Sequence, residues 1–231
     1  MKKRTTVLGS YDTAAYGWTL TSWVLSDPEM KTNYVERAGG DGAWDLSTVM
    51  TDGIPKYKDR NLTVTLECSK GTRADREQLV RDMVNLLDGL EWEIIPPDRL
   101  EYYLVGRLHV AVRQNDHAYA AVTVTGVCRP WLYRKRPTKY YLDLAQRPKP
   151  VLTVRNGGRL AVVPTVTVTG ANADICLGLG DPQEANDYVE VSGLPPGTYK
   201  LPDMLLRPGT HEFYVTGSGE LTISFREAVL R

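Results

Sequence analysis

Residues 60–90 read RNLTVTLECSKGTRADREQLVRDMVNLLDGL and contain the clearest secondary-structure signals in the chain. From Leu62 to Cys68 apolar residues alternate with polar ones, which is the period of a strand with one buried face. From residue 79 onward leucine, valine and methionine recur every three or four positions, which predicts an amphipathic helix. The stretch therefore predicts a strand followed directly by a helix over about residues 73–88.

The limits of this helix are marked by its flanking residues. Thr72 is a favourable N-cap, and Asp75 stands three residues later, where a capping box places its acid. Gly89 provides a C-terminal stop. Downstream, Leu108–Val112 and Ala118–Cys128 read as two strands that a turn joins into a hairpin. The order strand, helix, hairpin predicts an α+β domain rather than an alternating βαβ one.

The second half of the chain shows no helical period from about Tyr140 onward. Short strand-like runs alternate with glycine- and proline-rich turns, which predicts a β-sandwich. The expected strands are Val151–Val154, Leu160–Thr169, Asp174–Leu177, Tyr188–Val191, Glu212–Thr216 and Glu220–Phe225. A segment rich in proline and charge precedes them, so we place the domain boundary at residue 138. The expected fold is mainly β, with an N-terminal α+β domain over 1–138 and a C-terminal sandwich over 139–231.

Composition restricts the classes of function. The 231 residues contain 28 Lys+Arg and 28 Asp+Glu, and this neutrality argues against general nucleic-acid binding. Residues 129–150 mix basic and aromatic side chains, as a nucleic-acid groove does, but a solvated linker or a surface that docks on an acidic neighbour explains them better. No apolar run reaches the roughly 20 residues that span a bilayer, so no membrane insertion is expected.

A search for catalytic or ligand-binding motifs finds none. The three cysteines are far apart and form neither a disulfide framework nor a zinc motif. The three histidines do not make a metal-binding pair, and no nucleophile elbow or phosphate-binding loop is present. A pair of carboxylates could meet in space, but nothing singles one out. We therefore expect no enzyme activity, no cofactor and no metal.

Several residues stand out as candidates for contacts with another chain. Trp44 follows a glycine-rich loop, where it is either a contact anchor or a cap on its own core. Tyr57, Lys58 and Arg60 precede the Leu62 strand. They either form a polar seam between subunits or simply solvate an edge strand, and the second reading is slightly favoured.

Two adjacent tyrosines add a third candidate. Tyr102 and Tyr103 point to opposite faces if the chain is extended there. One ring should then be buried, and the other should be available to a neighbour.

Residues 39–68, GGDGAWDLSTVMTDGIPKYKDRNLTVTLEC, resemble the glycine-acid loop, D-L-S/T turn, Y-K-x-R motif and following strand of distal tail (Dit) proteins of phages with long non-contractile tails. The resemblance continues through the helix and through residues 98–107, DRLEYYLVGR, which end in a G-R strand start at Arg107. It also includes Asn156-Gly157-Gly158 and the strand near Val163–Val166. It spans most of residues 35–170 and depends on the order and spacing of short motifs.

The resemblance implies a structural role. Dit proteins form hexameric rings through an N-terminal β-sandwich with one helix and an extended hairpin, and they carry a jelly-roll or galectin-like C-terminal domain. The implied partners are copies of this chain, the major tail tube protein, the tail-associated lysin or fibre, and receptor-binding or baseplate proteins. The implied location is the virion tail tip, after assembly in the bacterial host cytoplasm.

An alternative function belongs to a different class. The C-terminal sandwich could act as a carbohydrate-binding module that aids host adsorption, with a sugar stacked on an exposed ring. The rings available in that half are Tyr140, Tyr141, Tyr188, Tyr199 and Tyr214, with no tryptophan. Stacking platforms are therefore sparse, and the hub function is preferred.

Overall fold

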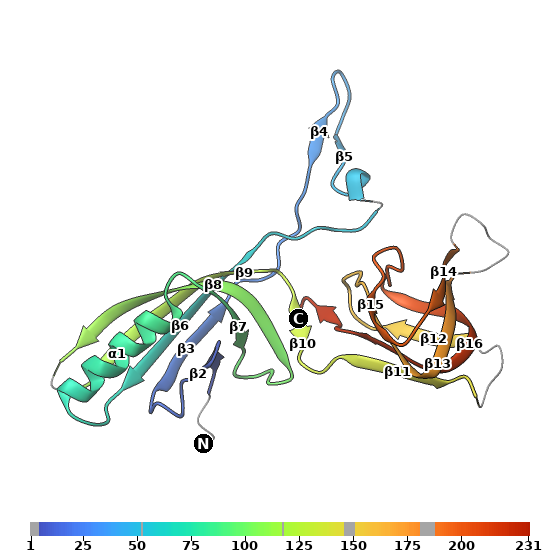
Figure 1. The fold of residues 1–231 in the computed structure, drawn as a ribbon. Helices are drawn as coiled ribbons and strands as arrows, with labels where there is room; N and C mark the ends of the chain where they lie inside the picture. Colours follow the sequence, from blue (N-terminus) through green and yellow to red (C-terminus); the bar gives the residue numbers. More distant parts are fainter. Residues whose placement is uncertain (1–4, 52, 117, 146–150, 181–187) are drawn as a thin grey trace. The chain divides into compact units, whose positions relative to one another are not determined.

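The computed structural model describes residues 5–51, 53–116, 118–145, 151–180 and 188–231 (Figure 1). The end of the basic segment, 146–150, lies outside the described residues. Contacts divide the chain into unit 1, residues 1–132 with Leu230, and unit 2, residues 133–229 with Arg231. The boundary proposed from the sequence, residue 138, lies a few residues beyond this division. The expected mainly β class is confirmed, with one α-helix in the described part of the chain.

Seven strands of unit 1 form an antiparallel sheet in the order β2-β1-β7-β8-β9-β6-β3 (Figure 1). The strands are β1 (Val7–Leu8), β2 (Tyr11–Asp12), β3 (Thr19–Leu25), β6 (Arg60–Cys68), β7 (Glu91–Ile95), β8 (Tyr102–Asn115) and β9 (Ala120–Cys128). The predicted hairpin is β8–β9, which pairs from Gly106 opposite Cys128 to Asn115 opposite Ala120. Strand β6 lies between β9 and β3 and is therefore an inner strand, not an edge strand.

Alternation in β6 produces the buried face that the sequence predicts. Leu62, Val64 and Leu66 are at most 1% exposed, whereas the threonines between them are partly exposed. Val122 and Val124 of β9 pair with Leu66 and Val64 and are also fully buried. These apolar side chains exclude water from one face of the sheet, and their burial is the main favourable term for the fold of unit 1.

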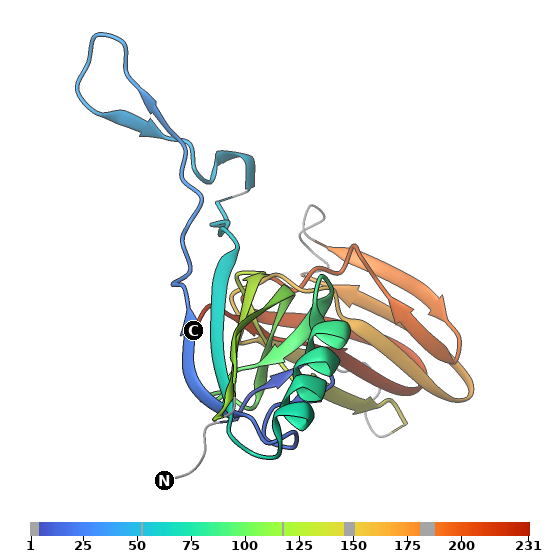
Figure 2. The same cartoon turned by 90° about the vertical axis from the view of Figure 1, so that its left-hand side faces the viewer.

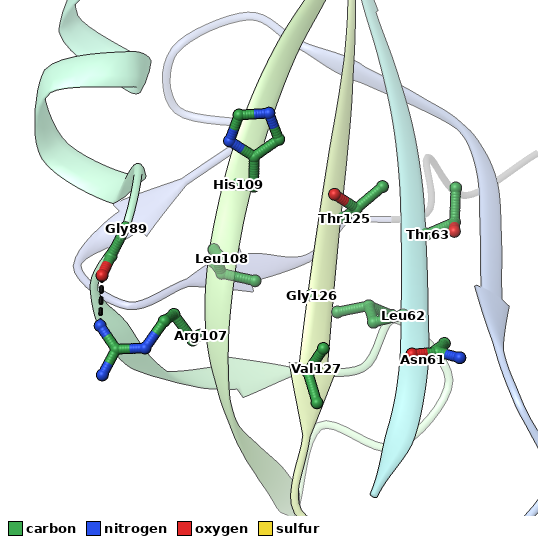
Figure 3. A pocket seen from close by; sticks show the side chains of 10 residues that line it. All are labelled: Asn61, Leu62, Thr63, Gly89, Arg107, Leu108, His109, Thr125, Gly126 and Val127. Carbon is green, nitrogen blue, oxygen red and sulfur yellow. Dashed lines mark hydrogen bonds between the residues drawn. The ribbon is translucent and has the colours of Figure 1, made fainter.

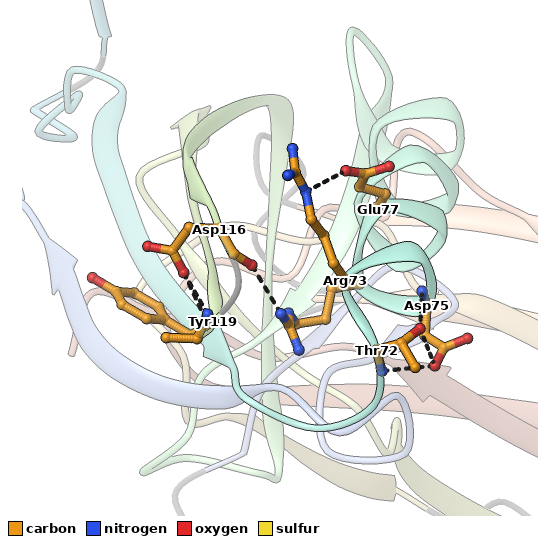
Figure 4. A network of polar contacts seen from close by, with 8 residues as sticks. Thr72, Arg73, Asp75, Glu77, Asp116 and Tyr119 are labelled. Atoms are coloured by element: carbon orange, nitrogen blue, oxygen red, sulfur yellow. Dashed lines mark hydrogen bonds and ion pairs between the residues drawn. The ribbon is translucent and has the colours of Figure 1, made fainter.

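Helix α1 (Arg73–Leu87) lies along β8 and β9, as Figure 2 shows. Its buried residues include Val80, Met83 and Leu87, one to two turns apart on the same side of the helix. The predicted capping box is present. The Thr72 hydroxyl accepts the Asp75 N–H at 3.2 Å, and the Asp75 carboxylate accepts the Thr72 N–H at 2.8 Å (Figure 4).

A buried arginine links this helix to the β8–β9 turn. Arg76 is 2% exposed and donates to the carbonyl oxygens of Gly71 and Asp116, each at 2.8 Å. The Asp116 carboxylate in turn accepts the N–H groups of Ala118 and Tyr119 (Figure 4). These hydrogen bonds join the first turn of the helix to the turn of the hairpin, and they offset part of the cost of burying the guanidinium.

Residues 26–59 leave the sheet of unit 1 as a long arm between β3 and β6 (Figures 1 and 2). Its far part is a two-stranded hairpin of β4 (Tyr34–Glu36) and β5 (Ala43–Asp45), followed by the 3-10 turn η1 (Val49–Thr51). All six residues of the hairpin strands are exposed. We call residues 26–59 the arm.

Unit 2 is built from antiparallel strands in the path β11-β16-β13-β14, with β12 on β16 and β15 on β13. The strands are β11 (Thr138–Asp143), β12 (Val151–Asn156), β13 (Thr165–Leu179), β14 (Val189–Leu194), β15 (Gly197–Lys200) and β16 (Gly209–Phe225). Two short strands, β10 (Leu132–Arg134) and β17 (Ala228–Val229), pair with each other. The expected C-terminal sandwich is thus present.

Strands β13 and β16 each run through a position where the sequence predicts a break. Their pairing shifts register between Thr169 and Asp174, opposite Gly219, and Gly217 pairs with the next residue, Ile175. Both glycines have positive φ, and a Cβ at Gly217 would lie 1.9 Å from the Asp174 carbonyl oxygen. The glycines therefore permit a bend within a continuous strand rather than ending it.

Other differences from the expected strands are smaller. Residues 160–164 are not part of β13, since Val162 makes only an isolated bridge to Leu206. Strand β11 lies within residues 129–150, which the sequence analysis interprets as a linker. The strand was not predicted because the proline and charged residues of this segment hide its alternation of apolar and polar residues. Strand β15 is absent from the expected strands; it begins at Gly197, directly after Pro195 and Pro196, in one of the glycine- and proline-rich stretches that predict a turn.

Candidate assembly surface

The arm carries large apolar side chains that are exposed in the described part of the structure. Met50 is 92% exposed, Val49 64% and Tyr34 61%. The full set of exposed large apolar residues on the arm is Tyr34, Val35, Trp44, Leu46, Val49 and Met50. A run of such residues on one projection, rather than scattered singly, marks a surface that contacts another molecule.

Trp44 lies on β5 and is 55% exposed. The Arg37 guanidinium carbon lies 5.7 Å from its ring centroid, which is within the range of a cation–π contact. The alternative in which Trp44 caps its own core is wrong, since more than half of the residue faces solvent. An exposed indole in a hairpin is suited to act as a contact anchor.

The base of the arm is a narrow antiparallel ladder. The Lys31 N–H donates to the Lys56 carbonyl and the Lys58 N–H donates to the Glu29 carbonyl, each at 2.8 Å. Between them Met30 forms a bridge with Tyr57. The Lys58 ammonium and the Glu29 carboxylate also form an exposed ion pair. The two strands of the base are therefore held together by backbone hydrogen bonds, while exposed charges add little.

Tyr57 connects the arm to the body of unit 1. Its ring meets the Trp131 ring edge to face, with centroids 5.5 Å apart. Edge-to-face packing of this kind orients a pair of aromatic rings and adds to the area that they bury. Tyr57 thus contributes to the attachment of the arm.

Arg60 does not have either of the roles that the sequence suggested. It is 4% exposed, and its side chain donates to the carbonyl oxygens of Ser26 at 2.7 Å and Leu230 at 3.1 Å. A buried guanidinium with these partners neither solvates an edge nor reaches a second subunit. It joins the start of the arm, the start of β6 and the C-terminal end of the chain within unit 1.

The two adjacent tyrosines differ in burial, as expected for neighbouring residues of an extended strand. Tyr103 is 7% exposed, whereas Tyr102 is half-buried at the start of β8. Only Tyr102 of the pair keeps substantial exposed surface.

Arg107 lies at a pocket of about 480 Å³ over the neighbouring strands β6, β8 and β9 (Figure 3). Its guanidinium donates to the Gly89 carbonyl just beyond the helix. The pocket is lined by Asn61, Leu62, Thr63, Gly89, Arg107, Leu108, His109, Thr125, Gly126 and Val127. Val127 is 56% exposed, so this part of the sheet presents apolar surface with a polar rim.

His109, one of the residues that line the pocket, contacts the Asp88 carboxylate at the end of the helix. Nδ1 of His109 lies 2.7 Å from the Asp88 carboxylate. The Asp88 carboxylate accepts a hydrogen bond from the Val110 N–H at 2.8 Å, and this bond is the largest cause of its lowered pKa. The nearby His109 lowers this pKa further. Asp88 therefore stays ionised and holds the end of α1 against β8.

The candidate residues do not form one site. Trp44 is on the hairpin of the arm, Tyr57 and Lys58 are at its base, and Arg107 is on the sheet of unit 1. Tyr34, Val49 and Met50 were missed by the sequence analysis. Their signal was present, because residues 26–59 place large apolar residues in a segment without a helical or strand period.

Within the described residues no group of three or more His, Cys, Asp or Glu is placed to hold a metal ion. None of the helices that the structure describes has the length and apolar character of a membrane span.

Comparison with solved structures shows that the chain has the fold of a phage adsorption-apparatus protein. It matches the SPP1 Dit protein, described as a paradigm of the hub adsorption apparatus in phages that infect Gram-positive bacteria, with a TM-score of 0.69 and 17% identity. The match covers 97% of this chain and 98% of that chain. A chain of the phage p2 baseplate matches with a TM-score of 0.43 and 9% identity, over 96% of this chain and 97% of the other.

Neither a family model nor a curated protein matches the sequence. The resemblance to Dit proteins that the sequence motifs suggested is confirmed as a likeness of fold along nearly the whole chain.

Proposed function

We propose that the protein is a structural hub of a phage tail tip, and that its arm joins neighbouring copies into a ring. The exposed apolar arm is the observation that carries this proposal. The likeness of fold to SPP1 Dit, a hub protein, along nearly the whole chain supports it.

The energetics of the arm support contact with a partner. Large apolar side chains gain on the order of 1.5–3 kcal/mol each when they are fully buried. Met50, Val49 and Tyr34 are each more than 60% exposed, so this chain alone realises little of that gain. A second chain that covers the arm would supply it.

We propose that the arm of one copy docks on the body of unit 1 of the next copy. The two copies then contribute different patches to the contact. Such heterologous contacts generate closed rings when the rotation between copies closes. We propose a homohexamer, as the resemblance to Dit proteins implies.

The other assignments follow from the same resemblance. The ring would join the major tail tube protein to the tail-associated lysin or fibre and to receptor-binding or baseplate proteins. It would be located at the virion tail tip after assembly in the bacterial host cytoplasm. We propose no catalytic activity, since none of the pockets and clusters described above suggests a reaction.

The test is the solution mass of the purified chain by light scattering over a concentration series, with the main species imaged in negative stain. The proposal predicts a particle six times the 25.8 kDa chain, seen as a ring with a central hole. A monomer across the series, with no ring formed when tail proteins from the same particle are added, would overturn it.

A further inference from the structure

Unit 2 contains a second pocket that the hub function does not use. It has a volume of about 470 Å³ and lies at the start of β16, where this strand meets the end of β13. Its lining residues are Leu179, Gly180, Leu205, Arg207, Thr210, His211, Glu212 and Tyr214. This volume is within the range of pockets that bind small molecules.

The lining offers hydrogen-bond donors and acceptors at close range. Arg207 carries fixed donors, Glu212 carries acceptors, and Thr210 offers a hydroxyl of either kind. All three residues are exposed. Because Arg207 and Glu212 have opposite charges, the pocket has no excess charge to attract a phosphate or a carboxylate.

Internal hydrogen bonds hold some of the groups that line this pocket. The His211 ring nitrogen Nε2 lies 2.7 Å from the Arg207 carbonyl oxygen, which orients the imidazole. The Tyr214 hydroxyl donates to the Glu212 carboxylate at 3.4 Å. The Gly180 N–H donates to the Glu212 carbonyl at 3.3 Å, which holds the backbone on which that carboxylate stands. The His211 ring and the backbone at Glu212 are thus held in place, which lowers part of the entropy cost of binding.

Apolar surface lies beside these polar groups. Leu205 is 41% exposed, and the half-buried Tyr214 also lines the pocket. A ligand that suits the pocket therefore combines several hydroxyl groups with an apolar C–H face and carries no net charge. These are the properties of a pyranose sugar.

We propose that this pocket binds a neutral saccharide, with Arg207 and Glu212 hydrogen-bonded to vicinal hydroxyls and Leu205 or Tyr214 against the sugar ring. Open pockets with few contacts bind weakly, so the affinity expected for one sugar unit is in the millimolar range. Several copies in a ring would raise the avidity for a polymer that repeats this unit. The binding of a single sugar does not depend on ring formation.

The test is a titration of the full chain with glucose, galactose, rhamnose, N-acetylglucosamine and N-acetylgalactosamine, followed by NMR. The proposal predicts saturable shifts of the His211 and Tyr214 signals with at least one of these sugars. Arg207→Ala and Glu212→Ala should each weaken binding tenfold or more. Matched variants outside the pocket, Lys200→Ala and Glu190→Ala, should bind as the original chain does.

Two results would overturn the proposal. The first is the absence of any shift of the His211 and Tyr214 signals with all five sugars at saturating concentration. The second is binding that the pocket variants leave unchanged while their amide spectra show a folded chain. If the chain forms rings but binds no sugar, the pocket proposal is wrong and the hub proposal stands. If the chain stays a monomer but binds sugar, the hub proposal is wrong and the pocket proposal stands.

Discussion

Helix α1 and the arm both connect strands of one sheet, but the helix buries apolar side chains and the arm exposes them. The helix joins β6 to β7 and buries Met83 completely. The arm joins β3 to β6, which already pair directly, and leaves Met50 92% exposed. The helix therefore contributes to the stability of the single chain, whereas the exposed apolar residues of the arm contribute little to it. This difference supports the proposal that the arm serves contacts outside its own chain.

Truncation of the helix core should give the largest loss of stability. Met83→Ala removes a side chain that is 0% exposed between α1 and the sheet. The expected decrease in the free energy of unfolding is about 2–5 kcal/mol, from lost burial and the cavity left behind. Chemical denaturation measures it. Met50→Ala on the arm is the matched control, and an equal loss there would remove the contrast between the two regions.

The arginine that links the helix to the β8–β9 turn should have the next largest effect. Arg76→Ala leaves the Gly71 and Asp116 carbonyls without these donors and should decrease the free energy of unfolding by about 1–3 kcal/mol. Arg73 is three residues earlier and pairs only with Glu77 at the surface. Arg73→Ala should change stability by about 0.5 kcal/mol or less. Similar losses for the two arginines would show that burial of Arg76 has no consequence for stability.

The capping box predicts a smaller effect that depends on pH. Hydrogen bonds from the Thr72 backbone and side chain lower the pKa of Asp75 from its ordinary value of 3.8. Because the folded pKa is depressed, this stabilisation is fully present above the ordinary pKa and is lost as the pH falls through the folded value. Asp75→Asn should therefore lower the thermal midpoint near neutral pH and have little effect in strong acid. A difference in midpoint that is independent of pH would contradict this assignment.

The sequence predicted the elements whose signals are local. The alternation of β6, the helical spacing of α1 and the Thr72–Asp75 capping box depend on neighbours a few residues apart, and all three are confirmed. The bends in β13 and β16 were predicted as breaks. The reason is that a glycine in a bend and a glycine in a turn look alike until the partner strand is known, as Gly217 shows.

The candidate site was harder to predict from the sequence than the fold. Arg60 looked like a surface charge, because its partners Ser26 and Leu230 are far away in the sequence. Trp44 could be singled out from its glycine-rich setting, but its exposure depended on whether the loop folds back. Met50 and Val49 carried no periodic signal, and only the three-dimensional course of the arm shows that they are exposed among the residues that the structure describes.

The arm itself should give the smallest change in stability and the largest change in assembly. Trp44→Ser together with Met50→Ser removes two exposed apolar side chains that make little contact with the body of unit 1. The free energy of unfolding of the single chain should change by about 0.5 kcal/mol or less, as for most surface substitutions. The matched control Val24→Ser removes an exposed apolar residue of β3 outside the arm.

The most direct test of the central claim is the solution mass of this double variant beside that of the original chain, measured by light scattering at equal concentrations. The account predicts rings for the original chain and for Val24→Ser, and folded monomers of 25.8 kDa for the double variant. Rings of undiminished stability in the double variant would contradict the claim that the arm joins the copies.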